Sequence, residues 1–386
     1  MHYRLIKEKI MPWKEVTKMK SKIEFIRFAL EGSQPFSGLC NAFGISRKTG
    51  YKLMKRYKEH GMEGLEEKSR QPHTIPKKTD SIIGDKILAV RRRKPSWGGR
   101  KIRALLINQG EKNIPATSTI TDILRRNGMI VYSPAERSKN LQRFEHEAPN
   151  DLWQADFKGH FAMHKGRCHP LTVLDDHSRF SIGLRACDNE RGNTVKMHFI
   201  ELFEEYGLPY RINFDNGSPW ASPHIRHYRY TEFSTWLIRL GIRVSFSKIR
   251  HPQTNGKDER FHRTLKDELL RYHYFFDTHD AQKHFDPWRV EYNFERPHEA
   301  LNMQPPVSRY VISKRKYPQK LPEIEYSTGD LIRRVDKVGL ISFKNKDIFI
   351  SESLRGLPVA LRECGNGQYN IYFCAQKIAC IDLREG

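Results

Sequence analysis

The 386-residue sequence lacks the features that mark membrane proteins and secreted proteins. It contains no run of about 18 apolar residues, and its start, MHYRLIKEKIMPWK, has no apolar core of the signal-peptide kind. Its six cysteines are scattered without a CxxC pair, which predicts reduced thiols and no disulfide framework. His164, Cys168 and His169 match no common zinc-ligand spacing. We therefore expect a soluble, intracellular protein without structural zinc.

Acidic residues are scarce relative to basic ones, and the imbalance is uneven along the chain. The formal net charge of +23 indicates a polyanionic partner, although basicity alone does not separate DNA from RNA. Residues 1–150 hold 32 basic and 15 acidic residues, whereas residues 151–300 hold 22 and 21. This distribution predicts that the first region binds phosphates and that the second assembles a cation site.

The basic N-terminal region contains a helix-turn-helix pattern. Ser37–Phe43, a turn at Gly44 and a helix from Ser46 to about His60 make up this pattern. Side chains at the start of the second helix of this motif can contact base edges or phosphates of DNA. Here these side chains are Arg47, Lys48, Thr49 and Lys52. The alternative is an ordinary helical hairpin with a solvated basic face.

A second helical unit is expected at about Ser81–Gly128, after the polar linker Lys68–Lys78 with its two prolines. It includes the basic run Arg91–Lys94 and two shorter helices, and is predicted to be a plain or winged helix-turn-helix. Whether its basic run binds DNA or forms a solvated face stays open.

Three acidic residues occupy settings that are unusual for surface carboxylates. Asp156 lies inside the apolar run Leu152–Phe157, and Asp215 ends a predicted strand just before a turn. Glu259 lies in the first turn of a helix that begins at about Lys257, where the helix dipole favours a carboxylate. A surface ion pair or a turn cap would explain any one of them, but three together predict a shared site.

Other charged residues near these acids are expected to have different roles. Arg263 and Lys266 share a helical face with Glu259 and are expected at phosphates, ion pairing with Asp267 being the alternative. Asp258 is expected to point about 100° away from Glu259 around the helix, which makes it a poor candidate for a metal ligand. The pair Asp175 and Asp176 is interpreted as part of a hydrogen-bonded turn with His177 and Arg179, contact with the metal in rivalry with the triad being the alternative. A structural role is also expected for Asn293, Arg296 and His298.

Five stretches resemble the integrase core of bacterial insertion-sequence transposases, the DDE type whose catalytic domain is similar to retroviral integrase. They are WQADFKGHF, LTVLDDHSRF, FDNGSPW, HPQTNGKDERFHRTLK and YNFERPHEAL. MPWKE and FGISRKTGY extend the resemblance toward the N-terminus, and residues 1–10 are expected to be an extension before Met11. The resemblance implies a catalytic and metal-binding triad of Asp156, Asp215 and Glu259. The interval from Asp215 to Glu259 is longer than usual for the family and predicts a surface insertion at Pro219–Tyr230.

The resemblance also implies a multidomain fold. We expect a helix-turn-helix domain at 11–67, a second one at 79–135, an α/β ribonuclease-H-like core at 145–312 and a small β-barrel at 322–386. Periodicity supports a mixed five-stranded sheet with helices in the core, its first strand at about Leu152 to Phe161. Short strands between Gly and Asn turns support the barrel.

The function implied is that of a DNA transposase that binds the terminal inverted repeats of its element and catalyses strand cleavage and strand transfer. Three converging carboxylates predict two Mg²⁺ or Mn²⁺ ions, because acids so close repel one another without a cation. Partners would be double-stranded DNA and further copies of the chain, as a homodimer or larger assembly, in the bacterial cytoplasm at the nucleoid. The alternatives are a metal-dependent nuclease that does not join strands and a non-catalytic DNA-binding regulator.

Overall fold

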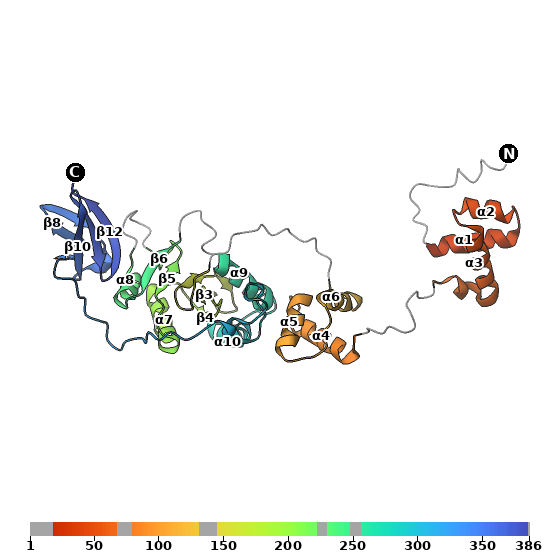
Figure 1. Ribbon diagram of the computed structural model, residues 1–386, viewed down its shortest axis with the longest axis horizontal. Helices are drawn as coiled ribbons and strands as arrows, with labels where there is room; N and C mark the ends of the chain where they lie inside the picture. Colours follow the sequence, from red (N-terminus) through yellow and green to blue (C-terminus); the bar gives the residue numbers. More distant parts are fainter. Residues whose placement is uncertain (1–17, 68–78, 131–144, 222–229, 248–255, 385–386) are drawn as a thin grey trace. The chain divides into compact units, whose positions relative to one another are not determined.

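A computed structural model describes residues 18–67, 79–130, 145–221, 230–247 and 256–384. The chain divides into two compact units, Met1–Lys78 and Thr79–Gly386, each of which is described by itself (Figure 1). The linker predicted at Lys68–Lys78, the HPQTN part of the longest motif and residues 222–229 of the predicted insertion lie outside the described residues. None of the helices in the described ranges combines the length and apolar character that a membrane span needs.

Residues 18–67 of the first unit form three helices, α1 (Lys18–Glu31), α2 (Phe36–Ala42) and α3 (Arg47–His60), followed by a short 3-10 turn. Helix α3 begins where predicted because Ser46 caps it, its hydroxyl accepting a hydrogen bond from the Thr49 amide at 3.2 Å. Gly50 allows α3 to approach its neighbours, since an added Cβ would lie 2.7 Å from Cys40 Sγ. The predicted helix-turn-helix is therefore confirmed.

The second unit begins with another three-helix module, formed by α4 (Ser81–Arg93), α5 (Gly99–Asn108) and α6 (Thr117–Arg126). Its core surrounds the fully buried Trp97 and includes Ile87, Ile102, Leu105, Ile120 and Leu124. Gly99 has the same role here as Gly50 in the first unit, because a Cβ on it would lie 2.8 Å from Thr121 Oγ1.

A mixed six-stranded sheet forms the centre of the second unit. The strands are β1 (Trp153–Phe157), β2 (Phe161–Ala162), β3 (Arg167–Asp175), β4 (Ser181–Cys187), β5 (Arg211–Phe214) and β6 (Arg243–Phe246). Their order is β2-β3-β1-β5-β6, with β4 on β3; β1 pairs antiparallel with β3 and parallel with β5. We predicted five strands, but the first of them breaks at Gly159, whose φ of +83° ends β1 and leaves β2 as a separate short strand.

Helices cover both faces of this sheet. One apolar core joins Trp153, Ala155 and Val173 of the sheet to α7 (Gly192–Tyr206) and α8 (Glu232–Arg239). The other joins Leu174 and Leu184 to α9 (Gly256–Leu265) and α10 (Thr278–Phe294), and α9 continues as a π-helical turn at Lys266–Leu270. Because side chains alternate along a strand, Asp156 lies on the α9 face when Ala155 lies on the α7 face.

The C-terminal part is rich in strands, as expected. A four-stranded sheet has the order β12-β11-β10-β7, and a two-stranded sheet joins β8 to β9. These strands are β7 (Leu331–Arg334), β8 (Leu340–Phe343), β9 (Lys346–Phe349), β10 (Pro358–Gly365), β11 (Gln368–Phe373) and β12 (Gln376–Asp382). Closure of these strands into a barrel stays a prediction.

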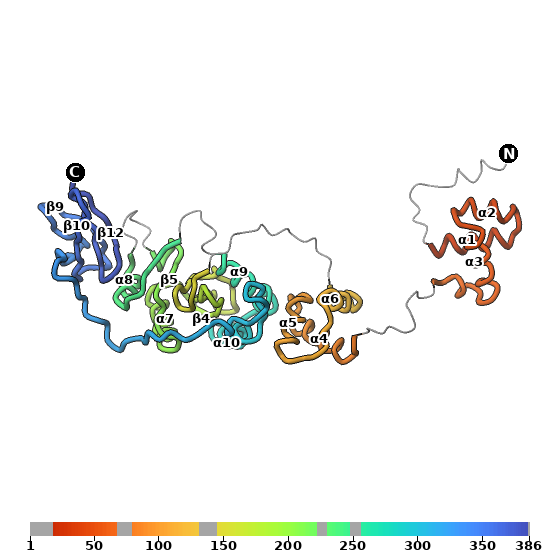
Figure 2. The backbone as a smooth tube through the Cα atoms, viewed as in Figure 1, coloured from red at the N-terminus to blue at the C-terminus, as the bar shows by residue number. Residues whose placement is uncertain are grey.

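The segment between the sheets, blue in Figure 2, is hydrogen-bonded to the core. Ser313 donates its amide to the Tyr206 carbonyl at 3.0 Å, and the Arg315 carbonyl accepts from the Leu208 amide at 2.7 Å. Farther on, the Gln376 side chain accepts from the Val244 amide at 2.8 Å and donates to its carbonyl at 2.9 Å. The C-terminal sheets are thus attached to β6 of the central sheet.

Candidate active site

Asp156 and Asp215 lie at the carboxyl ends of neighbouring parallel strands. The β1–β5 register pairs Trp153 with Ile212 and Gln154 with Asn213, and two further residues bring Asp215 alongside Asp156. Burial and, next, the negative charge of Asp215 raise the pKa of Asp156 to about 7. The two predicted acids are therefore brought together, close enough for their carboxylates to repel each other.

The backbone after β5 fixes the Asp215 carboxylate. Its Oδ1 accepts a hydrogen bond from the Gly217 amide at 2.9 Å. A Cβ on Gly217 would lie 3.2 Å from the same carboxylate, so this tight turn favours glycine. Asn216 donates its side-chain amide to the Ser247 carbonyl at 2.7 Å, which ties the turn to the end of β6. The FDNG part of the motif thus positions a carboxylate at the sheet edge.

Glu259 lies in the first turn of α9, as predicted, and its side chain is exposed. Arg263 and Lys266 are also exposed, so these three residues form an outer face of the helix. The alternative partner of the two bases, Asp267, is paired instead with Arg271 at 2.9 Å. Within the described ranges, no three His, Cys, Asp or Glu side chains converge as an ion-binding group. The placement of Glu259 at the cation therefore stays a prediction.

The side of α9 that faces the sheet carries another acid, Asp258. It is 3% exposed, and burial followed by the charge of Asp156 raises its pKa well above the usual range. One turn later, His262 Nε2 lies 2.8 Å from Thr172 Oγ1, which donates to the Asp156 carbonyl at 3.0 Å. Since that hydroxyl has a single proton, His262 must donate to it, which fits a neutral ring whose pKa burial lowers to about 4.

The turn after β3 is held by hydrogen bonds, as interpreted from the sequence. Asp175 accepts from the Ser178 amide at 2.8 Å and from the Asn150 amide at 2.7 Å. Asp176 accepts from the Gln154 side chain at 2.7 Å and pairs with Lys257 at 2.5 Å. These contacts position the start of α9 against the sheet and give both acids of the LTVLDDHSRF motif, Asp175 and Asp176, a structural role.

Residues of the YNFERPHEAL motif anchor α10 and the segment that follows it. Asn293 accepts from the Ser181 amide at 2.7 Å and donates to its carbonyl at 3.0 Å, which ties α10 to β4. Arg296 donates to both carboxylate oxygens of Glu268 at 3.0 and 3.1 Å. The structural role expected for these residues is consistent with these contacts.

A junction between α4–α6 and the core was not predicted. Trp97 donates its indole N–H to Glu268 at 3.0 Å, and Lys101 lies 3.4 Å from the same oxygen. Lys94 is paired with Glu291. The partners are more than 160 residues apart in the chain, so no local pattern could have revealed them.

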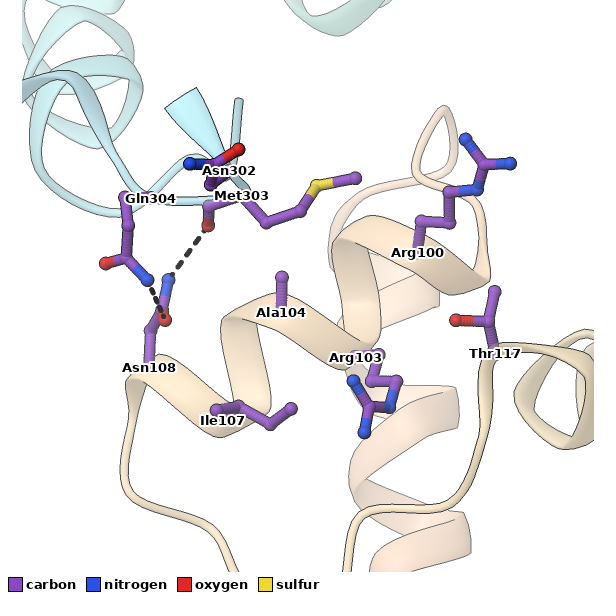
Figure 3. A pocket seen from close by; sticks show the side chains of 9 residues that line it. All are labelled: Arg100, Arg103, Ala104, Ile107, Asn108, Thr117, Asn302, Met303 and Gln304. Atoms are coloured by element: carbon purple, nitrogen blue, oxygen red, sulfur yellow. Dashed lines mark hydrogen bonds between the residues drawn. The ribbon is translucent and has the colours of Figure 1, made fainter. Parts of the chain in front are cut away.

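Next to this junction, the end of α5 meets the segment after α10. Figure 3 shows Asn108 reaching toward Met303 and Gln304, to which it is hydrogen-bonded at 3.3 Å in each case. A pocket of about 300 Å³ lies here and is lined in part by Arg100, Arg103 and Thr117.

The four predicted DNA contacts in the first unit all lie at the surface. Arg47, Lys48, Thr49 and Lys52 are exposed along the first turns of α3. The ion pairs found in the described ranges include none of the three basic residues, whereas Thr49 is engaged with Ser46.

Comparison with known proteins gives matches along most of the chain. Residues 146–252 and 240–306 match integrase core domain families, and residues 330–386 match the C-terminal domain of IS481 family transposases. Residues 21–73 match a helix-turn-helix domain family, and residues 49–124 match a homeodomain-like one.

Three relatives illustrate the similarity. A protein of insertion element IS136 from Agrobacterium fabrum is 32% identical over 35% of this chain and 69% of its own length. A protein of insertion element IS407 from Burkholderia multivorans is 23% identical over 60% and 81%. The transposase of transposon Tn552 from Staphylococcus aureus is 27% identical over 64% of this chain and 55% of its own length, so the chain spans about half of that relative.

Proposed function

This chain belongs to the insertion-element proteins with an integrase core, and from that premise we propose that it cuts and joins DNA at the ends of its own mobile element. It is a DDE-type polynucleotidyl transferase. The observation that supports the proposal is the Asp156–Asp215 pair at adjacent carboxyl strand ends, on a sheet against which α9 packs with Asp258 and Glu259 in its first turn. This arrangement suits phosphoryl transfer, in which positioning and charge stabilisation supply most of the catalysis.

The donor set fits a hard divalent cation. Asp156, Asp215 and Glu259 offer only carboxylate oxygens, which Mg²⁺ and Mn²⁺ prefer, and the repulsion between Asp156 and Asp215 favours a positive charge between them. We propose that Asp156, Asp215 and Glu259 would together hold two such ions. Ions so bound lower the pKa of water and stabilise charge on a leaving oxygen.

The protein residues would direct two successive displacements at phosphorus. Water first breaks a phosphodiester bond and frees a 3′-hydroxyl at the element end, and that hydroxyl then attacks a phosphodiester bond of target DNA. Each attack forms one P–O bond and releases one alcohol, so no covalent protein intermediate is required. Arg263 and Lys266, exposed beside Glu259, are proposed to bind the phosphates next to the reacting bond.

DNA recognition is assigned to the helical modules. Arg47, Lys48, Thr49 and Lys52 at the start of α3 are proposed to contact the terminal inverted repeats. The domain boundaries proposed are 11–67, 79–135, 145–312 and 322–386, with the last as a small barrel. Because two element ends must be handled together, we propose a homodimer or larger assembly on DNA, in the bacterial cytoplasm at the nucleoid.

A joining assay tests this function. Purified protein is incubated with labelled DNA carrying the element ends, a plasmid target and Mg²⁺ or Mn²⁺, and the wild type is compared with Glu259→Gln. Asp267→Asn is the matched control, because Asp267 lies on the same helical segment but pairs with Arg271. We expect joined products from the wild type and the control only. Nicking without joining would support the nuclease alternative, and end binding without cleavage would support a regulator.

A further inference from the structure

Asp258 occupies a position on α9 that suits an apolar side chain. The buried residues Phe261 and Leu265 follow it three and seven positions later, which places Asp258 on the stripe that faces the sheet. Rotation around the helix separates Asp258 from Glu259, as expected, but the buried side chain is Asp258 and the exposed one is Glu259. The first turn of α9 therefore presents one carboxylate inward and one outward.

The surroundings of Asp258 offer little compensation for its burial. Two of its charged neighbours, Asp156 and Asp176, are acids. One helical turn later, His262 contacts Thr172, which is hydrogen-bonded to the Asp156 carbonyl. The Oδ1 atom of Asp258 is buried and has no hydrogen-bond partner among the described residues. The neighbouring base Lys257 compensates it only weakly, because the ammonium of Lys257 is already bonded to Asp176 at 2.5 Å.

Such a carboxyl group is unfavourable in the folded protein. A buried polar group without a partner destabilises the folded state, and a like charge nearby adds to that destabilisation. An asparagine or valine at this position would avoid the repulsion. A residue that weakens the fold while facing a reacting group is characteristic of a functional site.

We propose that Asp258 is a further carboxylate of the cation site, which reaches Asp156 from the buried side of α9 while Glu259 serves the site from the outer side. This inference rests on the proposed function, since an integrase-type site is what places a divalent cation beside Asp156. Mg²⁺ and Mn²⁺ take carboxylate oxygens and complete their shell with water and phosphate, so an additional inward carboxylate is chemically suitable. Asp258 and Glu259, consecutive on α9, would then approach the cation site from two sides of the helix.

Mn²⁺ binding to the full chain without DNA tests the proposal, measured by calorimetry and by electron paramagnetic resonance. Asp258→Asn and Asp258→Val are compared with wild type, Glu259→Gln and the control Asp267→Asn. We expect both Asp258 variants to bind Mn²⁺ at least about 10-fold more weakly. Both should also raise the melting temperature of the metal-free protein, because the repulsion with Asp156 is removed. A merely structural aspartate would lower that temperature when replaced.

Two results would overturn the proposal: wild-type Mn²⁺ affinity in both Asp258 variants, or a lower metal-free melting temperature in both. The joining assay on the same proteins separates this failure from that of the proposed function. Wild-type joining together with unchanged Mn²⁺ affinity in the Asp258 variants would refute only the role of Asp258. A wild-type protein that binds Mn²⁺ but joins no DNA would refute the transposase function and leave the cation site standing.

Discussion

The two three-helix modules use their basic residues differently. In each, a glycine allows close helix packing, Gly50 in the first and Gly99 in the second. The first leaves Arg47, Lys48 and Lys52 exposed on α3. In the second module, many of the basic side chains bind carbonyl and carboxylate groups of the protein.

The contacts of the second module show where that charge goes. Arg91 donates to the carbonyls of Trp97 and Met129 at 2.7 and 2.8 Å, inside the module. Lys94 and Lys101 are paired with Glu291 and Glu268 of the core. A basic run can thus serve as a docking surface for acidic residues, and counting charges does not distinguish this use from phosphate binding.

Breaking the junction at Glu268 should have the largest effect. Glu268→Ala leaves the Arg296 side chain, only 9% exposed, without its carboxylate partner. We expect the free energy of unfolding of the second unit to fall by about 3–5 kcal/mol, as found when one partner of a buried pair is removed. Urea denaturation of the full chain measures it.

The matched control for Glu268 is Arg100→Ala. Arg100 lies 3.1 Å from Glu299, but the two side chains are 70% and 63% exposed. Arg100→Ala should lower the free energy of unfolding by less than about 1 kcal/mol, as for most surface ion pairs. Equal losses in the two variants would show that burial does not set the strength of this junction.

Removing positive charge from α3 should affect DNA binding and leave stability nearly unchanged. The triple change Arg47→Ala, Lys48→Ala and Lys52→Ala is expected to weaken binding to element-end DNA on the order of 100-fold, because phosphate contacts and their counterion release are lost. The dependence of affinity on salt should also become less steep. Fluorescence anisotropy at several salt concentrations measures both, and the same affinity in the variant would remove α3 from the DNA interface.

Titration of Lys101 should have the smallest effect. Burial, and then repulsion by Arg296, lower its pKa from 10.5 to about 8 and outweigh the attraction of Glu268. Between these two values the unfolded chain keeps a proton that the folded chain has released, so stability should rise with pH in this window, on the order of 1 kcal/mol. Urea denaturation near pH 8 and pH 10 should show this rise in the wild type and not in Lys101→Met. The same rise in Lys101→Met would assign it to another group.

Local patterns predicted the elements that local interactions determine. Ser46 indicated the start of α3, the apolar run around Asp156 indicated a strand, and the turn residues after Asp215 indicated a strand end. The split between β1 and β2 was missed because Gly159 was treated as part of a strand, although its positive φ ends the ladder.

The remaining features depend on contacts between distant residues. The burial of Asp258 follows from how α9 rotates against the sheet, and its helical position alone does not set that rotation. The Trp97–Glu268 junction joins residues 171 positions apart. Such pairings are fixed by tertiary packing, so a single sequence carries no local sign of them.

The side chain of Gln376 has a consequence for the assembly of the protein. An outer strand of a sheet exposes N–H and C=O groups that can recruit a strand from another chain. With one amide, Gln376 occupies both groups of Val244 on β6, and the C-terminal sheets hold it there. The Gln376 side chain thus makes the two hydrogen bonds that one peptide unit of an added strand would make, and so blocks strand addition at Val244. A strand from another chain therefore finds no free backbone group at Val244, at this point of the β6 edge.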